Sequence, residues 1–372
     1  MHSSWNREHD SIELTYPIFR DGAVSPKKLP FVVLAVAEFS AGDESEDLKS
    51  ISAEDCGENV LAALEPSVST NVPSVVPDAE DLAVSLVFRQ WQDFSVDAIA
   101  DRVPELRDWV SVREGLRCLQ QTAERDQTFS VTLCQILKDK DSDSKQADAS
   151  QREAFADLIS RYRDSFVGCD GESASIAAAY CASVDTRPLA RIYHHQTPLL
   201  LDALIQDVDT LLSRQLHAVL SDPQIVALTS TWMGFRYLCR TTTSLLDTQV
   251  RAVNCSAALL QAEATSGFLN EFINDEAGRE GFAPVSLIVA DFEAAPDSAK
   301  FFAGFVEACG KRLVPVVANA APALVGLQSW EDGNLVTQLR RNSIEPAGKP
   351  CGDLFARENF RFLALGGPGF LL

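Results

Sequence analysis

Two acidic side chains follow an apolar run in the last third of the chain. Asp291 and Glu293 come directly after residues 285–290, whose composition is typical of a buried strand. Carboxylates at the carboxyl end of a strand can carry acid–base chemistry or hold a polar ligand. No nucleophile, histidine or glycine-rich phosphate loop accompanies this pair in the sequence. A small-molecule-binding or hydrolytic α/β protein with a site near Asp291 is therefore an alternative, and we expect no enzyme activity.

The histidines form the one cluster that resembles a metal site. His194 and His195 are adjacent, and Asp185, Asp202 and His217 are close in sequence. Zinc sites on helices place their ligands at fixed spacings such as H-E-x-x-H, and these residues fit no such template. We interpret them as loop histidines and expect no bound metal.

Glycines and cysteines give no further reactive motif. The glycines of residues 366–369 lack the strand before and the helix after that a nucleotide-binding loop requires, so we expect no cofactor. The 9 cysteines include no C-x-x-C pair, and several lie in apolar stretches. This pattern favours reduced, buried thiols over metal ligands or disulfides.

The composition excludes two classes of partner. The chain has 372 residues, of which 46% are hydrophobic, and a formal net charge of -21, so it can bury sizeable cores but lacks the clustered cations that nucleic acid requires. The first ten residues contain no apolar core of signal-peptide length, and nowhere do about 18 apolar residues run together. We expect a cytoplasmic protein without membrane insertion.

Two amphipathic helices over residues 205–239 are the most informative elements. Apolar residues recur at i, i+3, i+4 and i+7 on both sides of a break at Ser221-Asp222-Pro223. Asp222 is a suitable N-cap for the second helix, and Pro223 suits its first turn. Trp232, Phe235 and Tyr237 could form a ligand platform, but aromatic residues at helical spacing favour a core. These helices point towards assembly and not towards chemistry.

This helical pair carries a family resemblance. Residues 207–223 read DVDTLLSRQLHAVLSDP and residues 232–238 read WMGFRYL. They resemble the most recognisable stretch of the large subunit of the type VI secretion contractile sheath, although Met233 replaces an arginine of that pattern. Residues 289–293 and 355–365 are similar to later segments of the same subunit.

The front of the chain resembles the other half of the same heterodimer. Residues 28–42 are similar to the opening strand of the sheath small subunit, and Trp91-Gln92-Asp93-Phe94, which leads to Val103 and Pro104, is similar to that subunit's signature. The chain thus resembles a natural fusion of a small-subunit region and a large-subunit region.

The segments between these motifs predict a mixed α/β (α+β) protein. We expect a small α/β domain at residues 1–138, a polar linker at 139–150, and a region at 151–372 that combines a helical hairpin with an α/β domain. In that domain a strand–helix–strand crossover predicts parallel pairing. Predicted strands cover residues 11–16 (ending at Pro17), 31–39, 82–88, 246–253, 285–290, 313–318 and 360–365. Predicted helices include 95–119, with a kink or a restart at Pro104, and 256–263, 267–274 and 298–309.

The resemblance implies a structural role in a contractile injection machine. Its partners would be other sheath protomers or copies of itself, with the inner tube protein, the baseplate and an AAA+ recycling unfoldase as further candidates. Sheath large subunits continue by another domain beyond the segment at residues 355–365, so the resemblance also implies a large-subunit region without that distal domain. This departure keeps open an adaptor that caps or regulates sheath or baseplate assembly.

Two groups of residues are candidate contacts with partners. Ile12, Leu14 and Tyr16 alternate with polar residues near one end of the chain, as in a strand whose free edge could pair with another molecule. The aromatic side chains of Trp232, Phe235 and Tyr237 form the second group.

Overall fold

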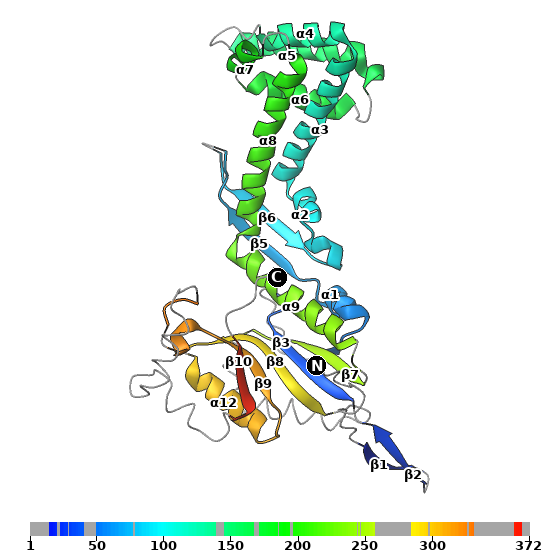
Figure 1. Cartoon of the computed structure of the whole chain (residues 1–372), viewed down its shortest axis with the longest axis vertical. Coiled ribbons are helices and arrows are strands. Elements are labelled where there is room, and N and C mark those ends of the chain that lie inside the picture. Colours follow the sequence, from blue (N-terminus) through cyan, green and yellow to red (C-terminus); the bar gives the residue numbers. More distant parts are fainter. Residues whose placement is uncertain are drawn as a thin grey trace, which may run out of the picture. The chain divides into compact units, whose positions relative to one another are not determined.

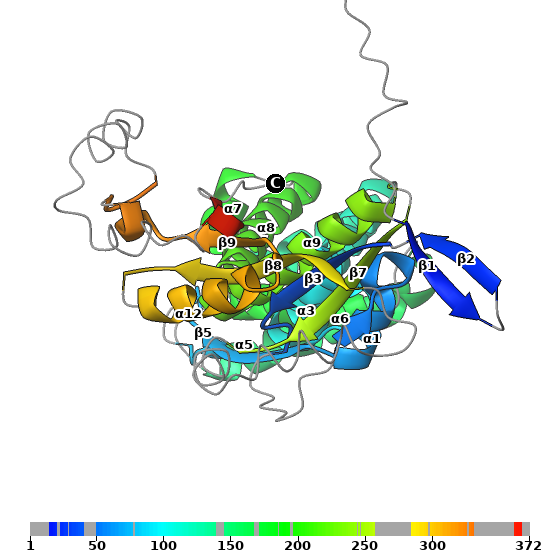
Figure 2. The same cartoon turned by 90° about the horizontal axis from the view of Figure 1, so that it is seen from below.

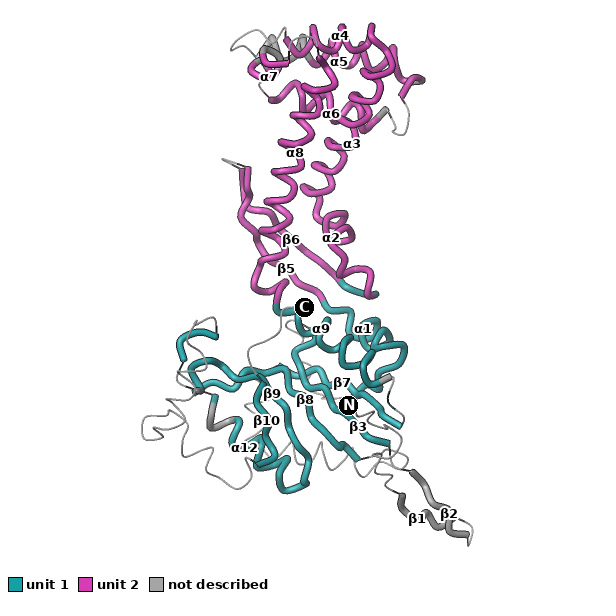
Figure 3. The backbone as a smooth tube through the Cα atoms, in the orientation of Figure 1, with its two compact units in different colours: residues 1–66, 88–90, 227–372 teal, residues 67–87, 91–226 magenta. Residues whose placement is uncertain are grey.

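The described part of the chain folds into two compact units. Unit 1 comprises residues 1–66, 88–90 and 227–372, and unit 2 comprises residues 67–87 and 91–226 (Figure 3). Each unit takes segments from both predicted regions. The computed structural model describes residues 15–20, 23–28, 30–40, 50–76, 79–138, 145–166, 171–184, 186–193, 196–243, 245, 247–256, 284–296, 298–325, 327–330 and 361–366.

Unit 1 is built on a six-stranded sheet (Figure 1). Every neighbouring pair in it is parallel except the short edge strand β4, which is antiparallel to β7. The central strand β3 is a continuous apolar run, as expected for a strand buried on both faces, whereas its neighbour β7 also contains Gln249 and Arg251. Their order is β10 (Leu363–Gly366), β9 (Val316–Ala320), β8 (Val285–Ala294), β3 (Phe31–Ala37), β7 (Thr248–Asn254) and β4 (Ser50–Ser52).

Two helices pack on opposite faces of this sheet (Figure 2). Phe302 and Phe305 of α12 (Ala299–Gly310) pack into a core with alternate strand residues such as Leu34 and Ile288. On the other face, α9 (Pro223–Thr243) contacts the strand residue Asp291 through Thr231. Unit 1 also contains the β1 (Thr15–Arg20) and β2 (Ala23–Lys28) hairpin, η1 (Asp55–Gly57), α1 (Glu58–Leu64) and η4 (Pro322–Val325).

Unit 2 is a helical core with a β-hairpin. Leu116 and Leu119 of α3 (Pro104–Arg125) lie in one buried cluster with Ala177 of α6 (Gly171–Ser183) and Leu204 of α8 (Thr197–Leu220). Gly115 permits the close approach of α3 and α6, because a Cβ at this position would lie 2.0 Å from the Ser173 carbonyl oxygen. The elements are β5 (Ser67–Val72), β6 (Leu82–Val87), η2 (Trp91–Phe94), α2 (Val96–Arg102), α3 (Pro104–Arg125), α4 (Gln127–Lys138), α5 (Lys145–Tyr162), η3 (Arg163–Ser165), α6 (Gly171–Ser183), α7 (Arg187–Ile192) and α8 (Thr197–Leu220).

The mixed α/β class and most predicted elements are confirmed. Both predicted helix caps are present: the Ser95 side chain accepts from Ala98 N at 3.2 Å, and Asp222 Oδ1 accepts from Gln224 N at 3.0 Å. The predicted crossover is present as β8, α12 and β9, with the two strands parallel. The helices predicted at 256–263 and 267–274 lie outside the described residues, except for Ser256, which is not helical.

Several strand boundaries were wrong. β8 continues to Ala294 beyond the predicted end at 290, and β10 begins at Leu363 and not at 360. β1 does not end at Pro17 but continues to Arg20, with Pro17 opposite Pro26 of β2. A two-stranded ribbon tolerates proline because the missing N–H need not be part of a ladder. The strand predicted at 313–318 begins only at Val316, after Leu313 adopts a positive φ of 60° that interrupts an extended chain.

Helix α5 begins at Lys145, inside the segment predicted as the linker. Residues 139–144 lie outside the described part. Lysine, glutamine and alanine at the start of α5 have good helix propensity, which explains why a polar segment can be helical. The division into regions at 1–138 and 151–372 stays a prediction about ancestry, because the compact units follow a different boundary.

Candidate functional site

Three aromatic rings form the centre of the contact between α9 and β3 in unit 1. Trp232, Phe235 and Phe39, which follows β3, are 0%, 4% and 1% exposed. The Phe39 ring centroid lies 5.0 Å from each of the other two, and Trp232 Nε1 donates to the Phe39 carbonyl oxygen at 2.9 Å. The indole thus joins ring packing to a buried hydrogen bond. Trp232 therefore holds the segment that follows β3 against α9.

The aromatic residues predicted as partner contacts therefore differ in their surroundings. Trp232 and Phe235 lie in the core of unit 1, as expected from their helical spacing, whereas Tyr237 is 61% exposed. Contact of any of the three with a partner stays a prediction, and Tyr237 is the one whose side chain is accessible.

Gly57 explains how α1 approaches this aromatic cluster. It has a φ of +85°, and a Cβ there would lie 2.7 Å from Cε1 of the Phe235 ring. Glycine meets both demands, because it has no Cβ and adopts positive φ at little cost.

The ladder around β3 joins the two regions through the backbone. Val36 is opposite Val253 of β7 on one side and Ala290 of β8 on the other. Beyond the strand, Asn254 Oδ1 accepts from the backbone nitrogens of Phe39 at 2.9 Å and Ser40 at 3.2 Å. A strand from the first region is thus enclosed by strands of the second.

Polar side chains of the helical motif bind the first region in unit 2. Gln215 is 2% exposed; its Nε2 donates to the Pro73 carbonyl oxygen at 3.0 Å, and its Oε1 accepts from Val75 N at 2.7 Å. Asp222 Oδ2 accepts from Thr70 Oγ1 at 3.0 Å. A glutamine amide can satisfy a backbone donor and a backbone acceptor at once, which suits it to a loop without regular pairing.

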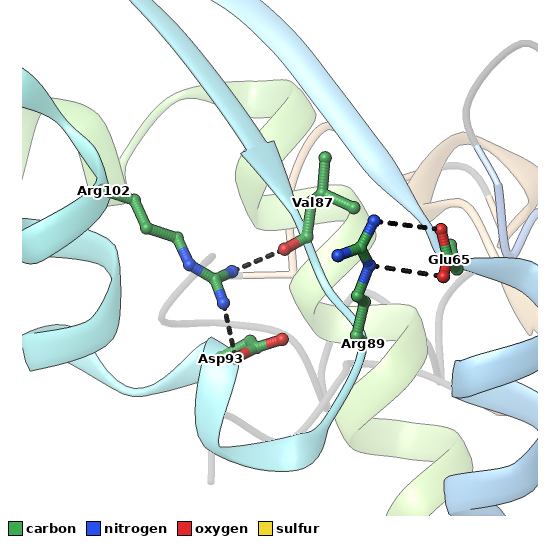
Figure 4. A network of polar contacts seen from close by, with 5 residues as sticks. All are labelled: Glu65, Val87, Arg89, Asp93 and Arg102. Atoms are coloured by element: carbon green, nitrogen blue, oxygen red, sulfur yellow. Dashed lines mark hydrogen bonds and ion pairs between the residues drawn. The ribbon is translucent and has the colours of Figure 1, made fainter.

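The Trp91-Gln92-Asp93-Phe94 motif also has a structural role in unit 2 (Figure 4). Asp93 is 3% exposed, and its Oδ1 lies 2.6 Å from Arg102 Nη2. Arg102 Nη1 donates to the Val87 carbonyl oxygen at 2.5 Å, so one guanidinium connects η2, α2 and β6. Within unit 1, Arg89 Nε pairs with Glu65 Oε1 at 3.2 Å on the surface.

Asp291 and Glu293 lie in the carboxyl-terminal half of β8 in unit 1. Asp291 accepts hydrogen bonds from Thr231 Oγ1 at 2.6 Å and Asn319 Nδ2 at 3.2 Å. Asp291 is exposed and lies beside a pocket of about 340 Å³ between α9 and the sheet. The arrangement can orient a carboxylate towards a ligand, and the described residues lining the pocket include no histidine or cysteine that could act as a nucleophile or base.

Most of the predicted histidine cluster lies outside the described residues. His194, His195 and Asp185 lie outside the described residues, and His217 is in the last turn of α8. Across the described ranges, no group of three or more His, Cys, Asp or Glu side chains is placed to hold a metal ion.

The first candidate interaction strand is only partly described. Tyr16 lies in β1, whose partner in the described part of the chain is β2, while Ile12 and Leu14 lie outside it. Strand addition through this segment stays a prediction.

The cysteines fit the expectation with one exception. Among the cysteines of the described ranges, Cys118 is disulfide-bonded and six are free thiols, all of them buried except the half-buried Cys56. Burial raises the pKa of Cys239 to about 12, helped by the nearby Cys56, and burial raises the pKa of Cys309 to about 12. None of the helices in the described ranges combines the length and apolar content needed to cross a bilayer.

Sequence interpretation missed Asn254 and the partner of Gln215. An asparagine at the end of a strand is common, so Asn254 gives no signal of its own. The polar Gln215 on the otherwise apolar side of an amphipathic helix was such a signal, because a buried amide requires hydrogen-bond partners.

Comparison with known proteins accounts for both halves of this architecture. Residues 6–150 match the family described as Type VI secretion system, VipA, and residues 202–372 match the family described as EvpB tail sheath N-terminal domain, VipB. No solved structure matches the chain.

Two curated proteins of Pseudomonas aeruginosa are similar to it. The type VI secretion system sheath protein TssC1 is 23% identical over 182 residues, which cover 46% of this chain and 36% of TssC1. The type VI secretion system sheath protein TssB1 is 30% identical over 135 residues, which cover 34% of this chain and 78% of TssB1. The chain therefore spans about a third of one relative and most of the other. It belongs to the sheath proteins of the type VI secretion system and carries a small-subunit and a large-subunit sheath region in one polypeptide.

Proposed function

We propose that this chain is a structural subunit of a type VI secretion sheath, or of a sheath-like assembly, in which small and large subunit regions form one covalent protomer. The observation that carries the proposal is the position of β3, a strand of the first region, between β7 and β8 of the second. Two separate chains would have to associate to build this sheet. Joining them makes that step intramolecular and raises the effective concentration of each for the other.

The proposed division of the chain follows from this interpretation. Residues 1–138 would correspond to the small subunit, 139–150 to the junction and 151–372 to the large-subunit region. The polar composition of 139–144 supports a junction there. Sheath proteins act inside the cell in this proposal, so the chain would be cytoplasmic.

Strand edges are the proposed means of assembly. In the described part, β10 and β4 are the outer strands of the sheet, and β1 pairs with β2 in a separate ribbon. An outer strand has unpaired backbone donors and acceptors on one side, which can pair with another chain. The proposed partners are copies of this chain or other sheath protomers, with the inner tube, the baseplate and an AAA+ unfoldase as further candidates.

Electron microscopy of the purified chain tests the proposal. We expect tubes, rings or filaments in negative stain, and removal of residues 1–28 should reduce assembly while far-UV circular dichroism stays close to wild type. Tyr237→Ala tests the predicted contact of this exposed aromatic side chain with a partner. The substitution removes no core packing, so reduced assembly of this variant would reflect a lost surface contact. Small defined oligomers without tubes would support a capping adaptor, and a monomer at high concentration would contradict assembly altogether.

A further inference from the structure

The two faces of the sheet in unit 1 are filled to different degrees. On the α12 face, bulky residues such as Leu34, Ile288 and Phe305 are almost fully buried. The α9 face presents small residues at β3, and its Val289 and Val317 are only half-buried. Small side chains leave space that a neighbouring helix cannot fill, and a pocket of about 340 Å³ occupies this space.

The pocket lies where the strand order of the sheet reverses. The next parallel strand along the chain after β3 is β7, which pairs with one edge of β3. The strands that follow, β8 and β9, lie on the other side of β3. The carboxyl ends of the adjacent strands β3 and β8 therefore form a topological switch point, and Ala37 and Asp291 line the pocket there. Crevices at this position of parallel sheets are the usual ligand sites of α/β folds.

One end of the pocket carries a fixed negative charge. The two hydrogen bonds from Thr231 and Asn319 orient the Asp291 carboxylate without neutralising it, because both donors are uncharged. Among the described residues no Lys or Arg pairs with it. A second hollow of about 440 Å³ shares Asp291 and also contains Glu293, so the polar end continues as an acidic opening.

We propose that this pocket binds a small molecule with a compact apolar body and a protonated amine. The apolar body would lie between α9 and the strands, where Phe39, Phe235 and Leu238 line the wall, and the amine would contact Asp291. The volume suits a single ring with a short chain, since ligand pockets usually measure about 300–1,000 Å³. A cation is favoured because it gains a charge-assisted hydrogen bond, whereas an anion would be repelled. This binding site is additional to the sheath role and does not depend on it.

Titration of the purified full chain with 2-phenylethylamine tests the proposal. 2-Phenylethanol and 3-phenylpropionate are matched probes with the same ring and a neutral or negative end. Saturation-transfer NMR and calorimetry should show saturable binding of the amine, about tenfold weaker binding of the alcohol and none of the acid. Failure of the amine to bind saturably, or equal affinity for amine and alcohol, would overturn the proposal.

Gly234→Leu is the variant that closes the pocket. A Cβ at Gly234 meets no heavy atom within 4 Å, so the new side chain enters open space and the helix need not shift. Gly304→Leu in α12 is the matched control, because a Cβ there also meets nothing within 4 Å. We expect amine binding to be lost in the first variant and unchanged in the second, with equal melting temperatures as the check on folding. Retained binding in Gly234→Leu would contradict the assignment.

Asp291→Asn removes the charge and keeps the cavity. It should weaken binding of the amine about tenfold and leave binding of the alcohol unchanged, because only the charged contact is removed. If Gly234→Leu instead alters the size of the assembly while no probe binds, the pocket receives a side chain of a partner protein and the small-molecule proposal is wrong. These titrations use the protomer alone, so their failure is distinct from a failure to assemble.

Discussion

The sheet of unit 1 and the helical core of unit 2 both combine the small-subunit and large-subunit regions, but through different interactions. In unit 1 the contact is a backbone ladder, with Val36 of one region hydrogen-bonded between strands of the other. In unit 2 it is side-chain packing, with Leu116 and Phe129 of one region in the same buried cluster as Leu204 and Val208 of the other. A ladder fixes register, because a slip of one residue reverses every side chain, whereas packing mainly fixes volume. The comparison predicts which substitutions each unit tolerates.

The largest effect is expected from the aromatic contact in unit 1. Trp232→Ala should lower the free energy of unfolding by about 4 kcal/mol, because it removes a fully buried ring and leaves the Phe39 carbonyl without its indole donor. Urea unfolding measures this change. Tyr237→Ala, on the exposed side of the same helix, should change it by less than about 0.5 kcal/mol. Equal midpoints for the two variants would show that the aromatic cluster does not hold β3.

A volume test addresses unit 2 in the same way. Gly115→Ala should destabilise by about 2 kcal/mol, because its Cβ would meet the backbone of α6 at 2.0 Å and force α3 and α6 apart. The control is Gly234→Ala, which has space and should be neutral or stabilise by up to about 1 kcal/mol through helix propensity. Thermal melts compare the two, and a stable Gly115→Ala protein would mean that the packing of α3 on α6 is not tight.

A polar contact in unit 2 should have a smaller effect. Gln215→Ala leaves Val75 N and the Pro73 carbonyl oxygen without their partner and should cost about 1.5 kcal/mol. Gln206→Ala on the exposed side of α8 is the control, since it removes only a surface hydrogen bond to Asp202. Chemical denaturation measures the free energy of unfolding of both variants. Equal values would refute a role for Gln215 in joining the regions.

Thiol labelling probes unit 1 without perturbing it. The pKa values of Cys239 and Cys309 are raised to about 12, so at pH 8 very little of either thiol is the reactive thiolate. Iodoacetamide should leave both unmodified in the folded protein and label them in urea, as mass spectrometry can follow. Rapid labelling of Cys239 under native conditions would indicate that α9 separates readily from the sheet.

Local patterns explain why many elements were predictable. The apolar runs at 31–39 and 285–290 have the length and composition typical of buried strands, and Ser95 and Asp222 are efficient caps. Proline at position 17 suggested a strand end, yet β1 continues to Arg20, because the missing N–H of Pro17 need not be part of the ladder with β2.

Pairing across long sequence distances was not predictable in this way. A continuous apolar run indicates a strand covered on both faces but does not say which strands flank it, so the position of β3 between β7 and β8 had to come from the structure. For the same reason the motif aromatics Trp232 and Phe235 could be assigned to a core, but their contact with Phe39 could not be foreseen. The carboxylates of Asp291 and Glu293 were recognisable from a local pattern, whereas the pocket beside Asp291 depends on residues from three strands and could not be predicted in this way.

Splitting the chain tests most directly whether its two sheath regions build one shared protomer. We would express residues 1–142 and 143–372 together, with an affinity tag on the first fragment only. The shared sheet and helical core predict that both fragments purify as an equimolar complex with the circular dichroism of the intact chain, and that neither folds when expressed alone. Two fragments that fold separately and elute as independent monomers would contradict the account.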